Sequence, residues 1–192
     1  MGVDIIYEPH ATTTDDEAGR ATGWLPGKLS MDGLRYARAL GERRRGEGLS
    51  AVFCSDLYRA VATVQQAFGG YRIPIHRDTR LRECDFGDLN GAPAAEVAAR
   101  QADHLDQPFP NGQSYRQVVD QMRGFLHDLV AAWDGHRVLL VAHQGNRWAL
   151  EHLLDGRPLA DLVTAPPDWR ASGRYALPKG WAGGQTAGGR LD

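Results

Sequence analysis

Short apolar runs alternate along this sequence with longer segments of helical periodicity, and this alternation constrains the fold more than any other feature. The predicted strands cover residues 3–7, 51–54, 73–76 and 138–142. The predicted helices cover residues 30–45, 55–68, 94–101, 114–133 and 146–154. Strands that alternate with helices favour an α/β fold, so we expect a three-layer α/β/α sandwich with a mainly parallel sheet.

The length of the chain, 192 residues, is sufficient for one compact domain. We expect this domain to span residues 1–178. Residues 179–192 are rich in glycine and lack apolar periodicity, so we predict a flexible tail there.

Charge and composition exclude several kinds of partner. The formal net charge is −2, without the basic excess that nucleic-acid binders usually have, and no apolar run is long enough to span a membrane. The two cysteines, Cys54 and Cys84, form no CxxC motif, so we expect neither a disulfide framework nor structural zinc. We therefore predict a cytoplasmic protein with no nucleic-acid or membrane partner, and we leave a homodimer open.

Titratable side chains recur where the predicted strands end. His10 follows the first strand, Ser55 and Arg59 follow the second, Glu83 follows the third, and His143 follows the most apolar one. Because the carboxyl ends of parallel strands meet at one edge of a sheet, we expect these side chains in one crevice. A neutral imidazole can attack phosphorus, arginine matches phosphate geometry, and glutamate can transfer a proton. The set indicates phosphoryl transfer through a phosphohistidine.

Six short segments in this sequence match an ordered set of motifs. They are Pro9-His10-Ala11 for RHG, Gly19 to Trp24 with Leu29-Ser30 for GRxxGW and LS, Ser55 to Ala60 with Thr63 for SSxLxRAxxT, Leu81 to Glu83 with Gly87 for LxExxxG, Gly112-Gln113-Ser114 for GES, and Val141 to Gly145 for VSHGG. Each segment alone is a weak signal, but together and in this order they are a strong one. From about residue 3 to residue 178 the chain resembles the histidine phosphatase superfamily, the phosphoglycerate-mutase-like proteins.

The resemblance implies a role for each matching residue. His10 would be the phosphorylated nucleophile, Arg59 and His143 would hold the phosphoryl oxygens, and Thr13 lies where the family has a hydroxyl near the phosphate. Glu83 would protonate the leaving group and then deprotonate the hydrolytic water. The implied activity is that of a metal-independent phosphomonoester hydrolase, without a cofactor, acting on a small phosphorylated metabolite.

Pro9 stands where the family's motif has an arginine. Loss of one such phosphate donor costs roughly 3 to 4 kcal/mol of transition-state stabilisation, so we predict weak turnover. Arg20, Arg82 and Arg147 are the candidates to replace the missing donor, and Arg147 is attractive because it falls on the first helical turn after His143.

Two other functions stay open at this point. One is a phosphoglycerate-type mutase, ranked lower because residues 84–137 are too few for the extra segments that such mutases carry. The other is a weakly active or inactive member of the fold that binds a phosphorylated ligand. Trp24, Trp148 and Trp169 are candidates to line a pocket for an apolar substrate group, or to pack in the core.

Overall fold

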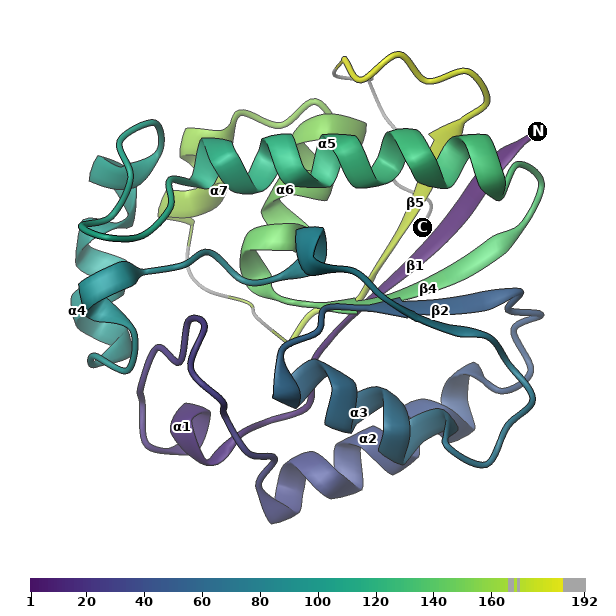
Figure 1. The fold of residues 1–192 in the computed structure, drawn as a ribbon, viewed down its shortest axis with the longest axis horizontal. Coiled ribbons are helices and arrows are strands. Elements are labelled where there is room, and N and C mark those ends of the chain that lie inside the picture. The colour runs from purple at the N-terminus through teal and green to yellow at the C-terminus, as the bar shows by residue number, and fades with distance from the viewer. Residues whose placement is uncertain (166–167, 169, 185–192) are drawn as a thin grey trace.

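The computed structural model describes residues 1–165, 168 and 170–184, and Figure 1 shows their arrangement. A five-stranded sheet forms the centre, with the strand order β3-β2-β4-β1-β5. The strands are β1 (Gly2–Pro9), β2 (Ala51–Cys54), β3 (Ile75–Arg77), β4 (Arg137–Ala142) and β5 (Gly173–Pro178). The first four strands are parallel, and β5 is antiparallel to β1. The predicted mainly parallel sheet is therefore confirmed.

Helices cover both faces of this sheet (Figure 1). One face packs against α2 (Met31–Arg44) and α3 (Tyr58–Phe68), and the other against α5 (Tyr115–Ala132), α6 (Gln144–Leu154) and α7 (Leu159–Thr164). The short helices α1 (Thr14–Glu17) and α4 (Ala94–Arg100) and the 3₁₀ turns η1 (Thr79–Leu81), η2 (Gly87–Leu89) and η3 (Gln101–His104) lie in the connections. The three-layer α/β/α prediction is confirmed.

Alternation along the central strands assigns their side chains to two cores. Ile5 and Tyr7 of β1 face the larger core beneath α5 and α6, whereas Ile6 faces the smaller core beneath α2 and α3. In β4, Leu140 and Leu139 alternate in the same way. A strand buried on both faces reads as an unbroken apolar run, which is why the segment at 138–142 was the clearest strand signal in the sequence.

β1 tolerates a proline at its end because of how its neighbours are placed. The amide of His10 donates to the carbonyl of Ala142 in β4, so the amide of the preceding residue would face the opposite neighbour, β5. The pairing of β5 with β1 ends where Gly173 lies opposite Tyr7, short of Pro9. The missing N–H of Pro9 therefore removes no ladder hydrogen bond.

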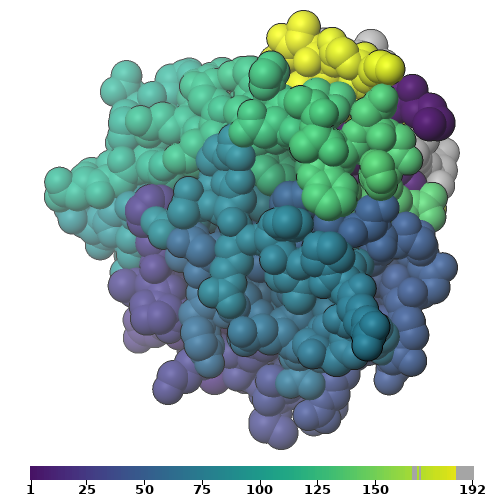
Figure 2. Space-filling model, turned by 45° about the vertical axis from the view of Figure 1, so that its right-hand side comes forward, coloured from purple at the N-terminus to yellow at the C-terminus, as the bar shows by residue number. Residues whose placement is uncertain are grey.

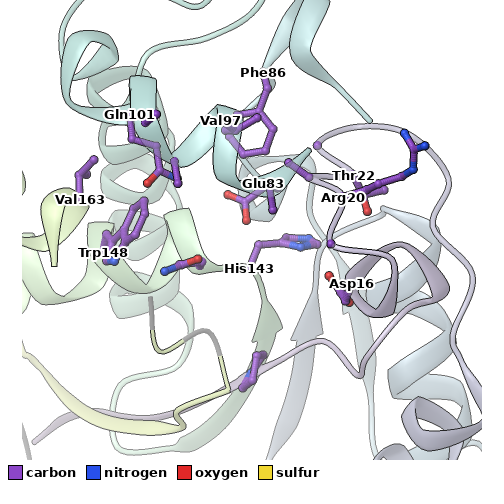
Figure 3. Close-up of a pocket in the computed structure, with 18 of the residues that line it drawn as sticks. Asp16, Arg20, Thr22, Glu83, Phe86, Val97, Gln101, His143, Trp148 and Val163 are labelled. Carbon is purple, nitrogen blue, oxygen red and sulfur yellow. The ribbon is translucent and has the colours of Figure 1, made fainter. Parts of the chain in front are cut away.

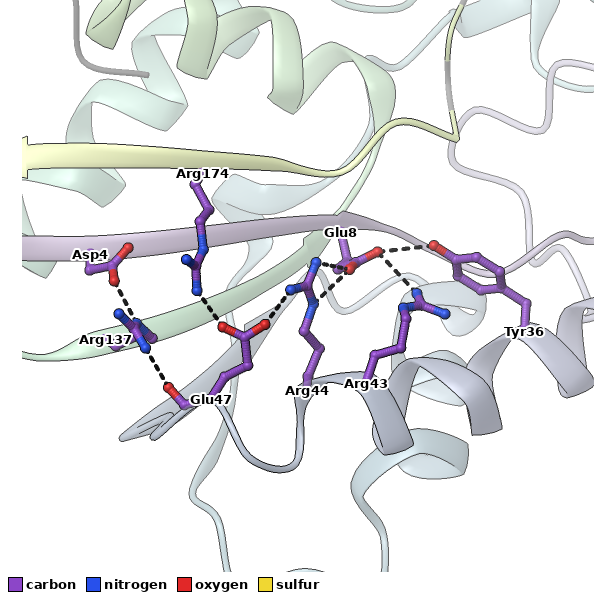
Figure 4. Close-up of polar contacts among 8 residues, drawn as sticks. All are labelled: Asp4, Glu8, Tyr36, Arg43, Arg44, Glu47, Arg137 and Arg174. Atoms are coloured by element: carbon purple, nitrogen blue, oxygen red, sulfur yellow. Dashed lines mark hydrogen bonds and ion pairs between the residues drawn. The ribbon is translucent and has the colours of Figure 1, made fainter. Parts of the chain in front are cut away.

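A polar network joins the end of α2 to the sheet (Figure 4). The Glu8 carboxylate of β1 is only 1% exposed, and it accepts hydrogen bonds from Nε and Nη2 of Arg44 at 2.8 and 2.6 Å and from the Tyr36 hydroxyl at 2.9 Å. Arg44 also pairs with Glu47, which in turn pairs with Arg174 of β5. A buried carboxylate is stable only when paired and hydrogen-bonded, and this network supplies both conditions.

The predicted flexible tail begins with residues that pack on the domain. Trp181 is buried in the larger core and its indole N–H donates to the Gly184 carbonyl at 2.9 Å, while Nε of Arg123 in α5 donates to the Gly183 carbonyl at 2.8 Å. Figure 2 shows this yellow segment lying against the green surface of α5. Residues 185–192 of the predicted tail, and Trp169, lie outside the described residues. Within the described ranges, no helix combines the length and apolar character needed to cross a membrane.

Candidate active site

A cleft of about 680 Å³ opens at the carboxyl edge of the sheet, and His10, Arg59, Glu83 and His143 all line it. His10 directly follows β1, Arg59 lies on the first turn of α3, and His143 directly follows β4 and caps α6. Glu83 comes from the segment after η1. The convergence that parallel strands predict is therefore present, and Figure 3 shows Glu83 and His143 in the middle of the cleft.

The ring of His10 presents a nitrogen lone pair to the cleft. Its Nδ1 lies 2.9 Å from the Ala11 carbonyl oxygen, which can only accept, so Nδ1 holds the proton. Its Nε2 accepts from Nε of Arg59 at 3.3 Å. Burial, followed by the positive charge of Arg59, lowers the pKa of His10 to about 4. The imidazole is therefore neutral near pH 7, the state that a nucleophile requires.

Arg59 is a buried cation, 2% exposed, whose side-chain contacts are all neutral. Besides His10, its guanidinium donates to the carbonyls of Gly23 at 2.9 Å and Leu25 at 3.4 Å. No carboxylate in the described part of the chain lies within ion-pair distance of it. Burial lowers its pKa from the ordinary value, although the more distant carboxylates of Glu83, Asp16 and Asp15 oppose the fall. A buried guanidinium without a directly bound carboxylate is a site for an anion, and its planar donors match phosphate oxygens.

The hydroxyl of Ser55 holds one ring nitrogen of His143. This hydroxyl oxygen accepts from the Leu57 amide at 3.2 Å and lies 2.7 Å from Nε2 of His143. Nδ1 of the same ring is buried and has no hydrogen-bond partner among the described residues. The ring centroid lies 5.0 Å from that of His10. With its proton on Nδ1, this ring would donate to a phosphoryl oxygen beside the nucleophile.

Two further contacts hold His143 in place. The Tyr7 hydroxyl of β1 donates to the His143 carbonyl at 2.9 Å, and the His143 amide donates to Oδ1 of Asn146 at 3.1 Å. Burial, together with the charge of Arg59, lowers the pKa of His143 well below its ordinary value. The ring is therefore neutral, and its position is set by both central strands.

Glu83 is oriented by main-chain amides. Its Oε1 accepts from the amides of Cys84 at 2.8 Å and Gly145 at 3.1 Å, and Trp24 donates its indole N–H to the Glu83 carbonyl at 2.7 Å. A Cβ at position 145 would lie 2.6 Å from that Oε1, so the close approach requires glycine. Burial raises the pKa of Glu83, although the amides and Arg59 oppose the rise. A raised pKa favours the protonated form that a general acid needs.

The remaining predicted phosphate ligands divide into one that lines the cleft and two that do not. Arg20 lines it and donates to the Gly91 carbonyl at 2.9 Å. Thr13 does not, because its hydroxyl is used with Asp16 to cap α1. Arg147 turns to Glu151 at 2.8 Å and to the Asp168 carbonyl at 2.7 Å, away from the residues that line the cleft.

Arg82, the other candidate to replace the missing donor, is also committed elsewhere. It pairs with both oxygens of Asp56 at 2.7 and 2.5 Å, and its guanidinium lies over the Trp24 ring at 4.5 Å from the centroid. Of the three arginines expected to compensate for Pro9, only Arg20 reaches the cleft.

The structure adds lining residues that sequence reasoning did not assign to the site. Pro9 itself forms part of the wall, and Phe86, Val97 and Val163 join Trp148 in an apolar part of the cleft. Trp148 was among the tryptophans predicted either to line a pocket or to pack in the core, and it does both. The apolar residues gave no signal in the sequence, because a cleft wall and a core have the same composition.

Comparisons with known proteins agree with this geometry. A model of the histidine phosphatase superfamily (branch 1) matches residues 9–168. A 2,3-bisphosphoglycerate-dependent phosphoglycerate mutase of Methylobacterium radiotolerans is 35% identical over 150 residues, covering 70% of this chain and 71% of the mutase. An adenosylcobalamin/alpha-ribazole phosphatase of Salmonella typhimurium is 29% identical over 144 residues, covering 71% of each chain. A mycobacterial glucosyl-3-phosphoglycerate phosphatase, solved with VO₃, aligns with a TM-score of 0.79 at 25% identity over 90% of this chain and 92% of its own.

Proposed function

The chain belongs to the histidine phosphatase superfamily, and we propose that it hydrolyses small phosphomonoesters through a phosphohistidine at His10. One observation supports this proposal above the others. The unprotonated Nε2 of His10 lies 3.3 Å from Nε of a buried arginine, Arg59, that forms no direct ion pair with a carboxylate of the described residues. A nucleophile and an unpaired cation at one point are what transfer of an anionic phosphoryl group requires.

The first step transfers the phosphoryl group to the protein. The Nε2 lone pair of His10 forms the P–N bond as the P–O bond to the leaving alcohol breaks, and the proton of Glu83 passes to the departing oxygen. Arg59 donates to the equatorial phosphoryl oxygens, where negative charge is spread during transfer, and His143 does so as well in the tautomer with its proton on Nδ1. The products are phospho-His10, the free alcohol and a Glu83 carboxylate.

The second step releases phosphate. Water forms a new P–O bond as the P–N bond breaks, and the Glu83 carboxylate takes the proton of the water. Inorganic phosphate leaves, and both His10 and Glu83 return to their starting forms. Each group is thus used in both half-reactions, and the set requires no metal ion.

A phosphoglycerate mutase is the second candidate, favoured by the relatives of that name. A mutase must hold a phosphoglycerate carboxylate while the phosphoryl group moves between two hydroxyls. Among the described lining residues, only Arg20 and Arg59 have a permanent positive charge, and Arg59 is needed at the phosphoryl group. That leaves only Arg20 among the described lining residues to hold the carboxylate, and its guanidinium already donates to the Gly91 carbonyl. The cleft therefore suits hydrolysis better than phosphoryl transfer between two hydroxyls. A cytoplasmic location and a homodimer stay predictions from the sequence.

A labelling experiment with product analysis tests the proposal. Brief exposure to a reactive ³²P-phosphodonor should give an acid-labile, alkali-stable label in the wild-type protein and none in His10→Ala. Any turnover of 3-phosphoglycerate, however slow, should yield inorganic phosphate rather than 2-phosphoglycerate. Undiminished label in His10→Ala would refute the covalent route, and 2-phosphoglycerate as the main product would identify a mutase.

A further inference from the structure

The cleft is larger than a phosphoryl group needs, and its spare part is mostly apolar, with Gln101 as a polar neighbour. Its volume of about 680 Å³ is within the range of roughly 300 to 1,000 Å³ typical of sites that enclose a whole small molecule. In Figure 3, Phe86 and Val97 lie above Glu83, Trp148 and Val163 lie to the left of Glu83 and His143, and Gln101 lies between the two pairs. Asp16, Arg20 and Thr22 lie on the other side of Glu83 and His143. The alcohol part of a bound ester lies on the side of its proton donor, Glu83. It would therefore face the four apolar side chains.

The four apolar side chains form a wall that exists before any ligand binds. The Phe86 ring packs edge-on against Phe109 at a centroid distance of 5.4 Å, and Trp148 packs likewise against Tyr115 at 5.3 Å. Phe86, Val97, Trp148 and Val163 are all at most 8% exposed. Because neighbouring core residues already fix these side chains, a ligand that contacts the wall loses little free energy to their ordering.

One face of α4 keeps the cleft wide beside this wall. Ala94, Val97, Ala98 and Ala99 line the cleft, whereas Ala95, on the same helix, does not. Ala98 is exposed, so its small side chain leaves open space rather than filling the core.

The charges in the cleft disfavour a second anionic group on the substrate. Of its two described arginines, Arg59 contacts His10, and Arg20 lies across the cleft from the apolar wall and donates to the Gly91 carbonyl. The lining residues also include the acidic side chains of Asp16 and Glu83. A carboxylate or second phosphate beside the wall would lose its water without gaining a cation, whereas an uncharged alkyl or aryl group would gain from burial.

We propose that Phe86, Val97, Trp148 and Val163 form a leaving-group subsite, and that the substrate is a phosphomonoester of an uncharged, largely apolar alcohol. This inference rests on the proposed phosphatase function, because it takes the phosphoryl group to lie at His10. It also gives a physical reason for a preference against phosphoglycerates, whose alcohol part bears a carboxylate.

Calorimetric binding of three non-hydrolysable ligands tests the subsite directly: methylphosphonate, hexylphosphonate and 2-carboxyethylphosphonate. The wild-type protein should bind hexylphosphonate at least tenfold more tightly than methylphosphonate, and 2-carboxyethylphosphonate most weakly. Ala98→Lys should reduce the hexyl preference to less than threefold and strengthen 2-carboxyethylphosphonate binding at least tenfold. Ala95→Lys adds the same charge to the same helix outside the cleft, so it should bind all three ligands as the wild type does.

Equal affinity for methyl- and hexylphosphonate, or tightest binding of 2-carboxyethylphosphonate, would overturn the subsite. Identical effects of Ala98→Lys and Ala95→Lys would overturn it as well. These binding measurements need no turnover, so a failure of the subsite proposal can be distinguished from a failure of the proposed phosphatase activity. A hexyl preference without hydrolysis of hexyl phosphate would refute the phosphatase and uphold the subsite, whereas hydrolysis with phospho-His10 but no chain-length preference would refute the subsite alone.

Discussion

Nε of Arg59 donates to Nε2 of His10 across 3.3 Å, so the guanidinium already occupies the side of the imidazole where phosphorus would bind. This contact keeps the lone pair of Nε2 directed into the cleft and keeps the ring neutral. It must also give way when phosphorus approaches, leaving the guanidinium to donate to the phosphoryl oxygens instead. Arg59 thus has a partner in both the resting and the loaded site.

The His10 ring should titrate near pH 4. Burial and Arg59 lower its pKa to about 4 from the ordinary 6.5, so its Cε1–Hε1 NMR signal should change only in strongly acidic solution. Arg59→Met removes one cause and should move the midpoint upward. Because the folded pKa lies below the unfolded one, the contribution of His10 to stability is complete above pH 6.5 and is lost as the pH falls toward 4. A wild-type midpoint near 6.5 would contradict this assignment.

Glu83→Gln should slow alkyl phosphates far more than 4-nitrophenyl phosphate. Glutamine still accepts from the Cys84 and Gly145 amides, so the geometry stays while the proton donor is lost. We expect kcat for hexyl phosphate to fall about 10² to 10⁴-fold. For the nitrophenyl ester, whose phenolate leaves without a proton, we expect a loss below about tenfold. Glu96→Gln, outside the cleft, is the control, and an equal loss for both esters would remove Glu83 from this role.

Pro9→Arg should raise kcat/KM by an order of magnitude or more. The substitution breaks no ladder hydrogen bond, because the position already lacks an N–H, and it adds a guanidinium to the wall beside His10. Pro9→Met gives similar bulk without charge and should not raise the rate. If Arg20 already supplies the missing donor, the added charge will be repelled: Pro9→Arg will then be neutral or harmful, and Arg20→Met will be severely impaired.

Arg44→Met should destabilise the protein by about 3 kcal/mol in urea unfolding at neutral pH. The substitution removes two hydrogen bonds from the nearly fully buried Glu8 carboxylate and leaves its charge short of partners. Arg35→Met breaks an ion pair with Asp32 that is about two-thirds exposed on both sides, so it should leave the urea midpoint unchanged. Equal midpoints for the two variants would show that the Glu8 network is not stabilising.

Four residues of the cleft could be located from the sequence: His10, Arg59, Glu83 and His143. They follow predicted strands, and parallel strands bring their carboxyl ends together at one edge of the sheet. Two further predicted phosphate ligands, Thr13 and Arg147, do not line the cleft, and their sequence neighbours indicate why. Thr13 precedes Asp16 at the spacing of a capping box, and Arg147 precedes Glu151 at the spacing of a helical ion pair. Both local pairings use the side chain that the site was expected to use.

The strand β5 could not be read from the sequence. Its segment Gly173–Pro178 includes a charged residue and ends in proline, and its strand conformation depends on antiparallel pairing with β1, more than 160 residues earlier in the chain. The pairing of distant segments is a tertiary property that local patterns do not encode. The same reason hid the apolar wall, whose members come from separate segments.

The hydrogen bond from Tyr7 to the carbonyl of His143 joins the ends of two adjacent central strands, so the spacing of the two imidazoles belongs to the sheet and not to any loop. The wall formed by Phe86, Val97, Trp148 and Val163 comes instead from loop and helical segments outside the sheet. The sheet thus sets the spacing of the two histidines, whereas the proposed selectivity depends on side chains outside the sheet, although Trp148 lies on α6, the helix that His143 caps. Substitutions in the wall can therefore change which substrate alcohols are accepted while the reacting groups stay unchanged. A designed exchange of α4, which supplies Val97, would serve the same purpose.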